Sequence, residues 1–124
     1  MIPESTHNHP SFKKSFGFAI KGCITALKTE RNICVMVALA LASIIAGFIV
    51  KLDTTGWVVV LLGSGMVLSA ELINTSIETV VDLASPEMHP LAARAKDIAA
   101  AAVWVLCMFV ACAGLLVFAR ALCC

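Results

Sequence analysis

The sequence predicts an all-α membrane protein in which three transmembrane helices follow an N-terminal amphipathic surface helix. Hydrophobic residues make up 60% of the 124 positions and charged residues only 14%, with a mean hydropathy of +0.98. A chain this short and this apolar is typical of one integral membrane domain. Long uncharged runs separate the charged residues, and most basic residues fall on one side of those runs. This asymmetry predicts an orientation as well as a fold.

Residues 1–10 are polar, contain two prolines and show no periodicity. They predict a disordered lead before a membrane-integral domain over residues 11–124. No signal peptide is expected, because the first apolar run begins only near Ile33. His7 and His9 lack a structured third ligand, so we interpret them as solvated side chains and not as a metal site.

Residues 11–29 predict a basic amphipathic helix. Its apolar residues recur at helical spacing, and its lysines fall mostly on another face (Phe12, Phe16, Ala19, Ile20, Cys23, Ile24 and Leu27 against Lys13, Lys14, Lys21 and Lys28). Such a helix lies in the membrane interface with its lysines toward anionic head groups. Two roles fit the pattern: a surface anchor alone, or an anchor in which Lys13 or Lys14 also binds phosphate.

Three segments are expected to cross the membrane. Residues 33–50 form an uncharged run long enough to span a bilayer. Residues 57–83 form a helix of about 40 Å, longer than a hydrocarbon layer of about 30 Å, so its last turns should emerge into water. A loop over 85–97, helical in its second half, leads into the third span at 98–119. The Gly63-Ser64-Gly65 segment is typical of close helix packing.

The distribution of basic residues predicts a cytoplasmic N-terminus and a cytoplasmic loop between the second and third spans. Seven basic residues lie on that side and two on the other (Lys13, Lys14, Lys21, Lys28, Arg31, Arg94 and Lys96 against Lys51 and Arg120). Positive residues stay in the cytoplasm during membrane insertion.

A stripe of polar side chains near the end of the second span is the main functional signal. Glu71, Asn74, Glu78 and Asp82 are spaced by 3, 4 and 4 residues, which places all four on one helical face. Carboxylates that share a face repel one another and resist desolvation near lipid. We therefore expect a divalent cation to compensate them.

These acids, with Lys96 and the basic helix, suit phosphoryl transfer. Mg²⁺ takes one or two carboxylates, with phosphate oxygens and water completing its shell, and Glu78 and Glu30 are the expected ligands. Glu71 is expected to accept the proton of an alcohol held at the interface, and Lys96 to neutralise the transferring phosphoryl group. Glu30 also fits a simpler role as an exposed hinge residue paired with Arg31 or Lys28.

The chain contains no Walker motif, kinase glycine-rich loop, HRD or DFG element, so an ATP site here is of a different kind. Three spans and one surface helix are too few to enclose both a nucleotide and a lipid. We therefore expect oligomerisation, with sites shared between subunits.

The motif Glu71-Leu-Ile-Asn-Thr-Ser-Ile-Glu-Thr-Val-Val-Asp82, with the later Glu87-Met-His-Pro90 and Arg94-Ala-Lys-Asp97, closely resembles the bacterial membrane-integral diacylglycerol kinase and undecaprenol kinase family. The resemblance covers about residues 11–120. It implies a homotrimer in the bacterial cytoplasmic membrane that uses ATP and Mg²⁺ to phosphorylate a membrane lipid alcohol in composite interfacial sites. Residues 11–124 would then form a membrane-integral lipid kinase domain.

By position, the resemblance implies Glu71 as the catalytic base and Glu30 and Glu78 as metal-associated, nucleotide-binding carboxylates. It also implies nucleotide contacts from four residues of the second loop and its helix (Glu87, His89, Lys96 and Asp97), with Asn74 and Asp82 as supporting polar residues. Members often carry Tyr where this chain has Met88, and this chain has no Tyr. The sequence over Ser85–Ala92 and Glu30–Asn32 resembles the undecaprenol kinase branch more closely, so undecaprenol is the favoured substrate.

Three alternatives accompany this interpretation: diacylglycerol as the substrate, a small ion-translocating membrane subunit, and a non-catalytic scaffold. The ion-translocating subunit would need acids near mid-membrane, whereas these gather at one end. No nucleic-acid partner is expected. Most of the six cysteines are predicted to be small buried hydrophobes, while Cys123 and Cys124 also fit an intermolecular disulfide.

Overall fold

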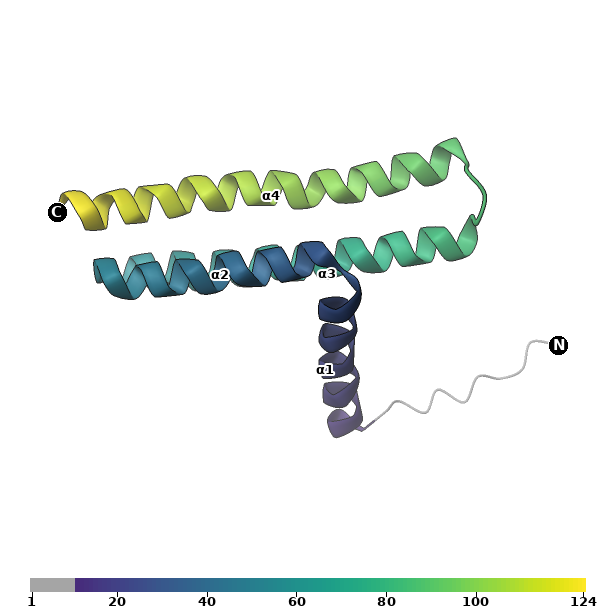
Figure 1. The fold of residues 1–124 in the computed structure, drawn as a ribbon, viewed down its shortest axis with the longest axis horizontal. Helices are drawn as coiled ribbons and strands as arrows, with labels where there is room; N and C mark the ends of the chain where they lie inside the picture. Colours follow the sequence, from purple (N-terminus) through teal and green to yellow (C-terminus); the bar gives the residue numbers. More distant parts are fainter. Residues whose placement is uncertain (1–10) are drawn as a thin grey trace.

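The computed structural model describes residues 11–124, and all regular structure within that part is helical. Four helices follow one another: α1 (Phe12–Thr29), α2 (Arg31–Val50), α3 (Thr54–Ala84) and α4 (Pro90–Cys123) (Figure 1). The lead predicted over residues 1–10, including His7 and His9, lies outside the described residues.

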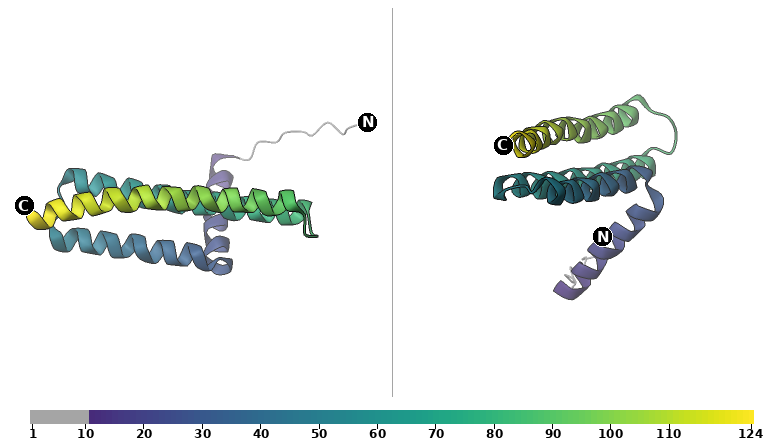
Figure 2. Two further views of the ribbon diagram at one scale, coloured as in Figure 1. Left: turned by 90° about the horizontal axis from the view of Figure 1, so that it is seen from above. Right: turned by 60° about the vertical axis from the view of Figure 1, so that its left-hand side comes forward.

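The helices α2, α3 and α4 run side by side, and α1 leaves them at a steep angle (Figures 1 and 2). The three long helices have 20, 31 and 34 residues and are apolar enough to cross a membrane. The prediction of an all-α chain with three membrane-spanning helices is confirmed. Since α3 is about 46 Å long at 1.5 Å per residue, part of it extends beyond a bilayer core of about 30 Å.

Local signals set the helix ends close to the predicted positions. The α3 helix begins before Trp57 because the Asp53 carboxylate accepts a hydrogen bond of 2.8 Å from the Gly56 amide and so caps its first turn. At the end of α2, Lys51 adopts a left-handed conformation (φ 58°) that turns the chain toward α3. The α4 helix is continuous from Pro90, so the predicted helical half of the loop and the third span form one element.

Close packing between α3 and α4 depends on Gly63. A Cβ atom at this position would lie 2.8 Å from Cγ1 of Val110, so the predicted role of this glycine in helix packing is confirmed. Gly65 differs, because a Cβ there would meet no atom within 4 Å. The second glycine of the segment therefore faces away from the packed interior of the single chain.

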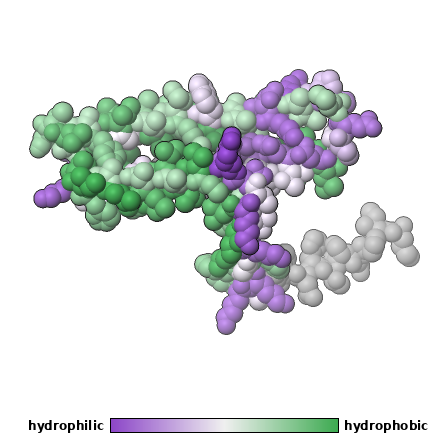
Figure 3. Space-filling view, viewed as in Figure 1, coloured by the Kyte–Doolittle hydropathy of each residue, from purple (hydrophilic) through white to green (hydrophobic). Residues whose placement is uncertain are grey.

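Most of the described surface is apolar and exposed, and only five hydrophobic residues are buried (Ala26, Ile33, Leu52, Val60 and Val103). Hydrophobic surface covers most of the length of the long helices, and polar residues gather at the α3–α4 loop and along α1 (Figure 3). The prediction of buried cysteines is wrong: all are exposed except the half-buried Cys107. Each long helix has few neighbours within one chain, so apolar side chains, thiols included, face outward.

Candidate active site

The predicted polar stripe lies on α3, and its first two members are the most buried polar residues of the described part. Glu71 is 4% exposed and Asn74 is 6% exposed, whereas Asp82, nearer the helix end, is exposed. The Asn74 Nδ2 group donates a hydrogen bond of 2.9 Å to Oε1 of Glu78, one turn further along. Two members of the stripe are therefore joined by a hydrogen bond, and burial increases along the stripe toward Glu71.

The other side of the Asn74 amide has no partner. Its Oδ1 atom is buried and accepts no hydrogen bond within residues 11–124. An unsatisfied buried polar group costs about 1–3 kcal/mol, so folds retain one mainly where a water, ion or ligand completes it. A second oxygen acceptor is thus available beside Glu71 and Glu78.

Lys96 connects α4 to this stripe. Its Nζ atom forms an ion pair with Oδ1 of Asp82, which confirms the prediction that Lys96 faces the carboxylates across the α3–α4 contact. Its side chain remains 36% exposed. Part of its positive charge therefore stays accessible to an anion that approaches from the water.

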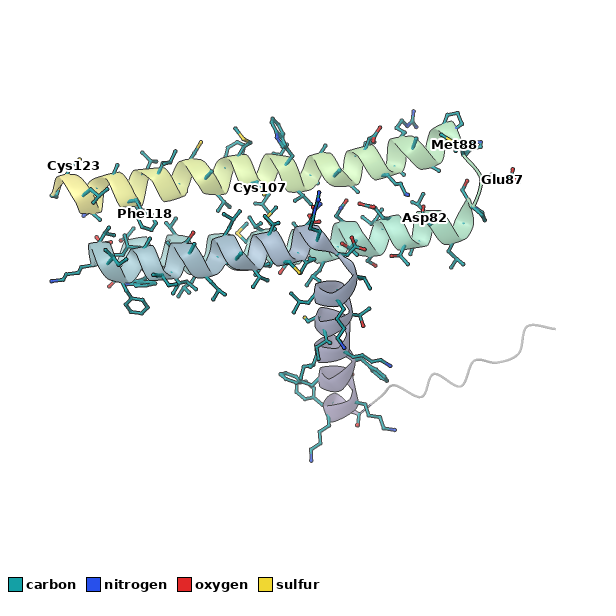
Figure 4. All side chains as sticks on the ribbon, viewed as in Figure 1. Asp82, Glu87, Met88, Cys107, Phe118 and Cys123 are labelled. Carbon is teal, nitrogen blue, oxygen red and sulfur yellow. The ribbon has the colours of Figure 1, made fainter. Side chains whose placement is uncertain are left out.

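The α3–α4 loop and the flanking helix ends form a groove of about 510 Å³, here called the loop groove. Four of the predicted site residues line it: Asp82, Glu87, His89 and Lys96. Asp82 lies on α3, while Glu87 lies in the loop that closes this end of the molecule (Figure 4). A hydrogen bond of 2.9 Å from Ser85 Oγ to the Glu87 carbonyl oxygen holds the loop. Asp97 is exposed and is not among the lining residues.

Glu30 lies in a different place, at the junction of α1 and α2. It lines a groove of about 700 Å³ between α1 and α3, opposite Leu72, Thr75 and Thr79. Glu78 is not among the residues that line this groove, so the two predicted metal ligands do not share it. The alternative pairing of Glu30 with Lys28 or Arg31 is absent from the ion pairs of residues 11–124.

The available donor atoms fit a magnesium ion that a nucleotide brings with it. Carboxylate oxygens and the free Asn74 Oδ1 are hard ligands of the kind that Mg²⁺ prefers. No group of three or more His, Cys, Asp or Glu residues capable of holding a metal ion occurs in the described chain.

Two features of the site were not foreseen from the sequence. His89 caps the start of α4 with its ring nitrogen, although a proline directly after a polar residue was an available signal for a helix start. Thr75 and Thr79 form the flank of the stripe that faces Glu30. Their spacing of 4 and 8 residues from Glu71 places them beside the acids on the same helix.

Together, the fold and the site define a small helical membrane protein whose polar site lies at one end of its longest helix pair. Residues 17–118 match the model of the prokaryotic diacylglycerol kinase family. The chain belongs to this family, and the predicted enzyme class, a lipid kinase acting on a hydroxyl group, is confirmed.

Individual relatives agree with this assignment. The chain is 44% identical over 107 residues to an undecaprenol kinase of Bacillus subtilis, covering 86% of this chain and 87% of the relative. It is 38% identical over 95 residues to a diacylglycerol kinase of Synechocystis, covering 76% and 54%. A diacylglycerol kinase of Helicobacter pylori is 33% identical over 101 residues, covering 82% and 79%.

Proposed function

We propose that this protein transfers the γ-phosphoryl group of ATP to the hydroxyl of a membrane lipid alcohol, with undecaprenol as the preferred substrate. The observation that carries the proposal is the buried Glu71 and Asn74, on the same face of α3 as Asp82, which pairs with Lys96, in a chain of the lipid kinase family. A carboxylate that is shielded from water is well suited to take a proton from an alcohol.

In the proposed reaction, Glu71 accepts the proton of the lipid hydroxyl while the alcohol oxygen forms a bond to the γ-phosphorus. The bond from that phosphorus to the β–γ bridging oxygen breaks, and ADP leaves with its electron pair. Lys96, which retains accessible charge beside Asp82, stabilises the negative charge on the transferring group. The burial of Glu71 keeps competing water away from the phosphoryl group.

Glu78 and Glu30 would hold the Mg²⁺ ion, which neutralises phosphate charge when bound. Asn74 supports this role because its amide orients one oxygen of Glu78. Glu87 and His89 line the loop groove and are the proposed nucleotide contacts of the loop. Asp97, one residue after Lys96, is the last of the proposed nucleotide-binding residues.

We propose a homotrimer, because a single chain does not enclose the proposed site. Glu30 lines the groove beside α1, whereas Glu78 lies elsewhere on the stripe. The face of α3 that carries Gly65 also remains open, with an apolar groove of about 450 Å³ lined by residues such as Leu61, Ser69 and Ile73. A neighbouring subunit would cover this face and enclose the proposed site between the two chains.

In the membrane, α1 would lie as an amphipathic surface helix at the interface. Its exposed phenylalanines support this placement, since Phe12 is 87% exposed and Phe16 and Phe18 are both 63% exposed. The positive-inside rule orients the N-terminus and the loop groove toward the cytoplasm of a bacterial cell. ATP would then reach the site directly from the cytosol.

The substrate preference can be tested with purified protein in mixed micelles that contain equal amounts of undecaprenol and diacylglycerol. After incubation with γ-labelled ATP and Mg²⁺, thin-layer separation would show which lipid carries the label. We expect undecaprenyl phosphate to dominate. Dominant labelling of diacylglycerol would reverse the preference, and no labelled lipid at all would reject the kinase function.

A further inference from the structure

The α4 helix starts with a histidine cap. His89 has extended backbone angles (φ −134°, ψ 137°), and its Nδ1 atom accepts a hydrogen bond of 3.1 Å from the Leu91 amide. Pro90 between them has no N–H group, so the Leu91 amide is the first donor at this helix end. The His89 carbonyl accepts from the Ala93 amide at 3.1 Å. One residue therefore terminates the loop and starts the helix.

This cap requires a particular protonation state. A ring nitrogen that accepts a hydrogen bond must carry a lone pair, so His89 must be neutral with its proton on Nε2. Protonation converts Nδ1 into a donor, which would then face the Leu91 N–H, another donor. The cap is therefore incompatible with the imidazolium form, which would also oppose the positive end of the helix dipole.

We propose that His89 is a positioning residue whose neutral form holds the loop groove together, so that its protonation loosens the first turn of α4 and weakens nucleotide binding. His89 and Lys96 lie on the same helix end, and both line the groove with Asp82 and Glu87. Three charged residues thus share the groove with His89: Asp82, Glu87 and Lys96. Loss of the cap would move Lys96 and the Glu87 loop relative to Asp82.

Two amide substitutions separate capping from direct nucleotide contact. In His89→Asn, the side-chain oxygen takes the place of Nδ1, and asparagine is a preferred N-cap residue. In His89→Gln, the longer side chain brings its amide to the place of Nε2 but is a poor cap. Neither side chain titrates between pH 5 and pH 8.

The direct test follows amide hydrogen exchange of the full-length protein in lipid nanodiscs by NMR, without nucleotide. As the pH falls from about 8 to about 5, the protection factor of the Leu91 amide should drop about fivefold, the range for a lost N-cap. The control is the Gly56 amide, which a carboxylate caps at the start of α3. Its protection should stay constant, because carboxylates remain ionised over this range.

In His89→Asn, protection of the Leu91 amide should be independent of pH. Constant protection of the wild-type Leu91 amide, while the His89 ring signals titrate, would overturn the inference. A pH response that survives in His89→Asn would also overturn it, because the cause would then be one of the three charged neighbours. The wild-type titration is decisive even if a variant does not fold.

The consequence for activity rests on the proposed function and is measured separately. In the wild type, we expect the KM for ATP to rise at least about fivefold between pH 7.5 and pH 5.5, beyond any pH response shared with His89→Asn. Because neither amide titrates, the KM should stay low at both pH values in His89→Asn, which keeps the cap, and should be raised at both in His89→Gln, which lacks it. The opposite order of the two variants would assign His89 to nucleotide contact through Nε2 instead. The exchange experiment needs no turnover, so it distinguishes failure of the cap from failure of the kinase assignment.

Discussion

The two ends of the α3–α4 pair use the same ion-pair chemistry and differ in what surrounds it. At one end, here called the Lys96 end, Lys96 pairs with Asp82. At the other, the Arg120 end, Arg120 Nη2 lies 3.7 Å from Oδ2 of Asp53. Each pair joins an aspartate in α3 or at its N-cap to a basic residue of α4, and both pairs are substantially exposed. An exposed pair alone contributes little to stability, so neither is informative by itself.

The neighbours of each pair distinguish the two ends. The Lys96 end continues along α3 into the buried Asn74 and Glu71, with a free amide oxygen between the acids. The Arg120 end opens on a smaller groove of about 260 Å³, where Lys51 and Asp53 are the other charged lining residues. The buried, unpartnered Asn74 Oδ1 atom therefore supports the proposed site at the Lys96 end, because folds retain such atoms mainly where a water, ion or ligand completes them.

The largest difference in activity between the two ends should appear when the basic residue at each end is replaced by an uncharged one. Lys96→Met should lower kcat/KM for ATP about 100-fold, the effect of removing one group that stabilises transition-state charge. Arg120→Met is the matched control. It should change kcat/KM less than about twofold, because the exposed Arg120–Asp53 pair that it removes has no proposed role in binding or catalysis. Steady-state kinetics in mixed micelles checks both variants. Equal losses of kcat/KM in the two variants would contradict the proposed functional difference between the two ends.

The second-largest effect is expected from loss of the Asn74 amide, which donates a hydrogen bond to Glu78. Asn74→Ala removes the 2.9 Å hydrogen bond to Glu78 and should raise the Mg²⁺ concentration needed for half-maximal activity about 10–100-fold, as expected for groups that orient metal ligands. Ser43→Ala removes a hydroxyl that bonds only to the Leu39 carbonyl in α2 and serves as the control. An unchanged Mg²⁺ requirement in Asn74→Ala would contradict the proposal that Asn74 orients Glu78 to hold the metal.

The helix contact between the two ends can be loosened at Gly63. Gly63→Ala should lower the free energy of unfolding by about 1–3 kcal/mol, the usual range for overpacking, because its Cβ would lie 2.8 Å from the stiff Val110 side chain. Gly114→Ala meets no atom within 4 Å and should have no such effect. Denaturation in mild detergent measures both. Val110→Ala combined with Gly63→Ala should recover part of the loss if the clash is the cause.

The smallest effect is expected from the Arg120 pair as a stabilising contact. Arg120→Gln should lower the free energy of unfolding by about 0.2–1 kcal/mol, the range measured for exposed ion pairs. The difference should shrink as salt is added, because exposed charges are screened. A loss of several kcal/mol that persists at high salt would show that the Arg120 end has a structural role beyond that of an exposed ion pair.

Sequence alone was sufficient for features determined by one helix or by two helices that follow each other in the chain. The shared face of Glu71, Asn74, Glu78 and Asp82 follows from helical spacing, and the three spans follow from the length of the uncharged runs. Lys96 could be placed opposite the stripe because the α3–α4 connection is short. Gly63 was recognisable as a packing residue for the same reason: its neighbour is an adjacent antiparallel helix.

Features that depend on helices far apart in the chain, on the number of surrounding helices or on one side-chain rotamer could not be predicted. The position of Glu30 opposite Thr75 and Thr79 depends on how α1 leaves the bundle, which periodicity does not encode. The exposure of the cysteines depends on how many helices surround each thiol. The His89 cap depends on the rotamer of a ring beside Pro90. Residue spacing identifies a face but does not specify what covers it.

The most direct test of the central claim is the transfer of labelled γ-phosphate from ATP to lipid by the wild-type protein and by Glu71→Gln. Glutamine has nearly the same shape but does not take up a proton, so labelled lipid should form at least about 100-fold more slowly. Binding of Mg-ATP, measured in parallel, should persist in the variant. Lipid labelling at the wild-type rate in Glu71→Gln would contradict the assignment of the buried carboxylate as the base.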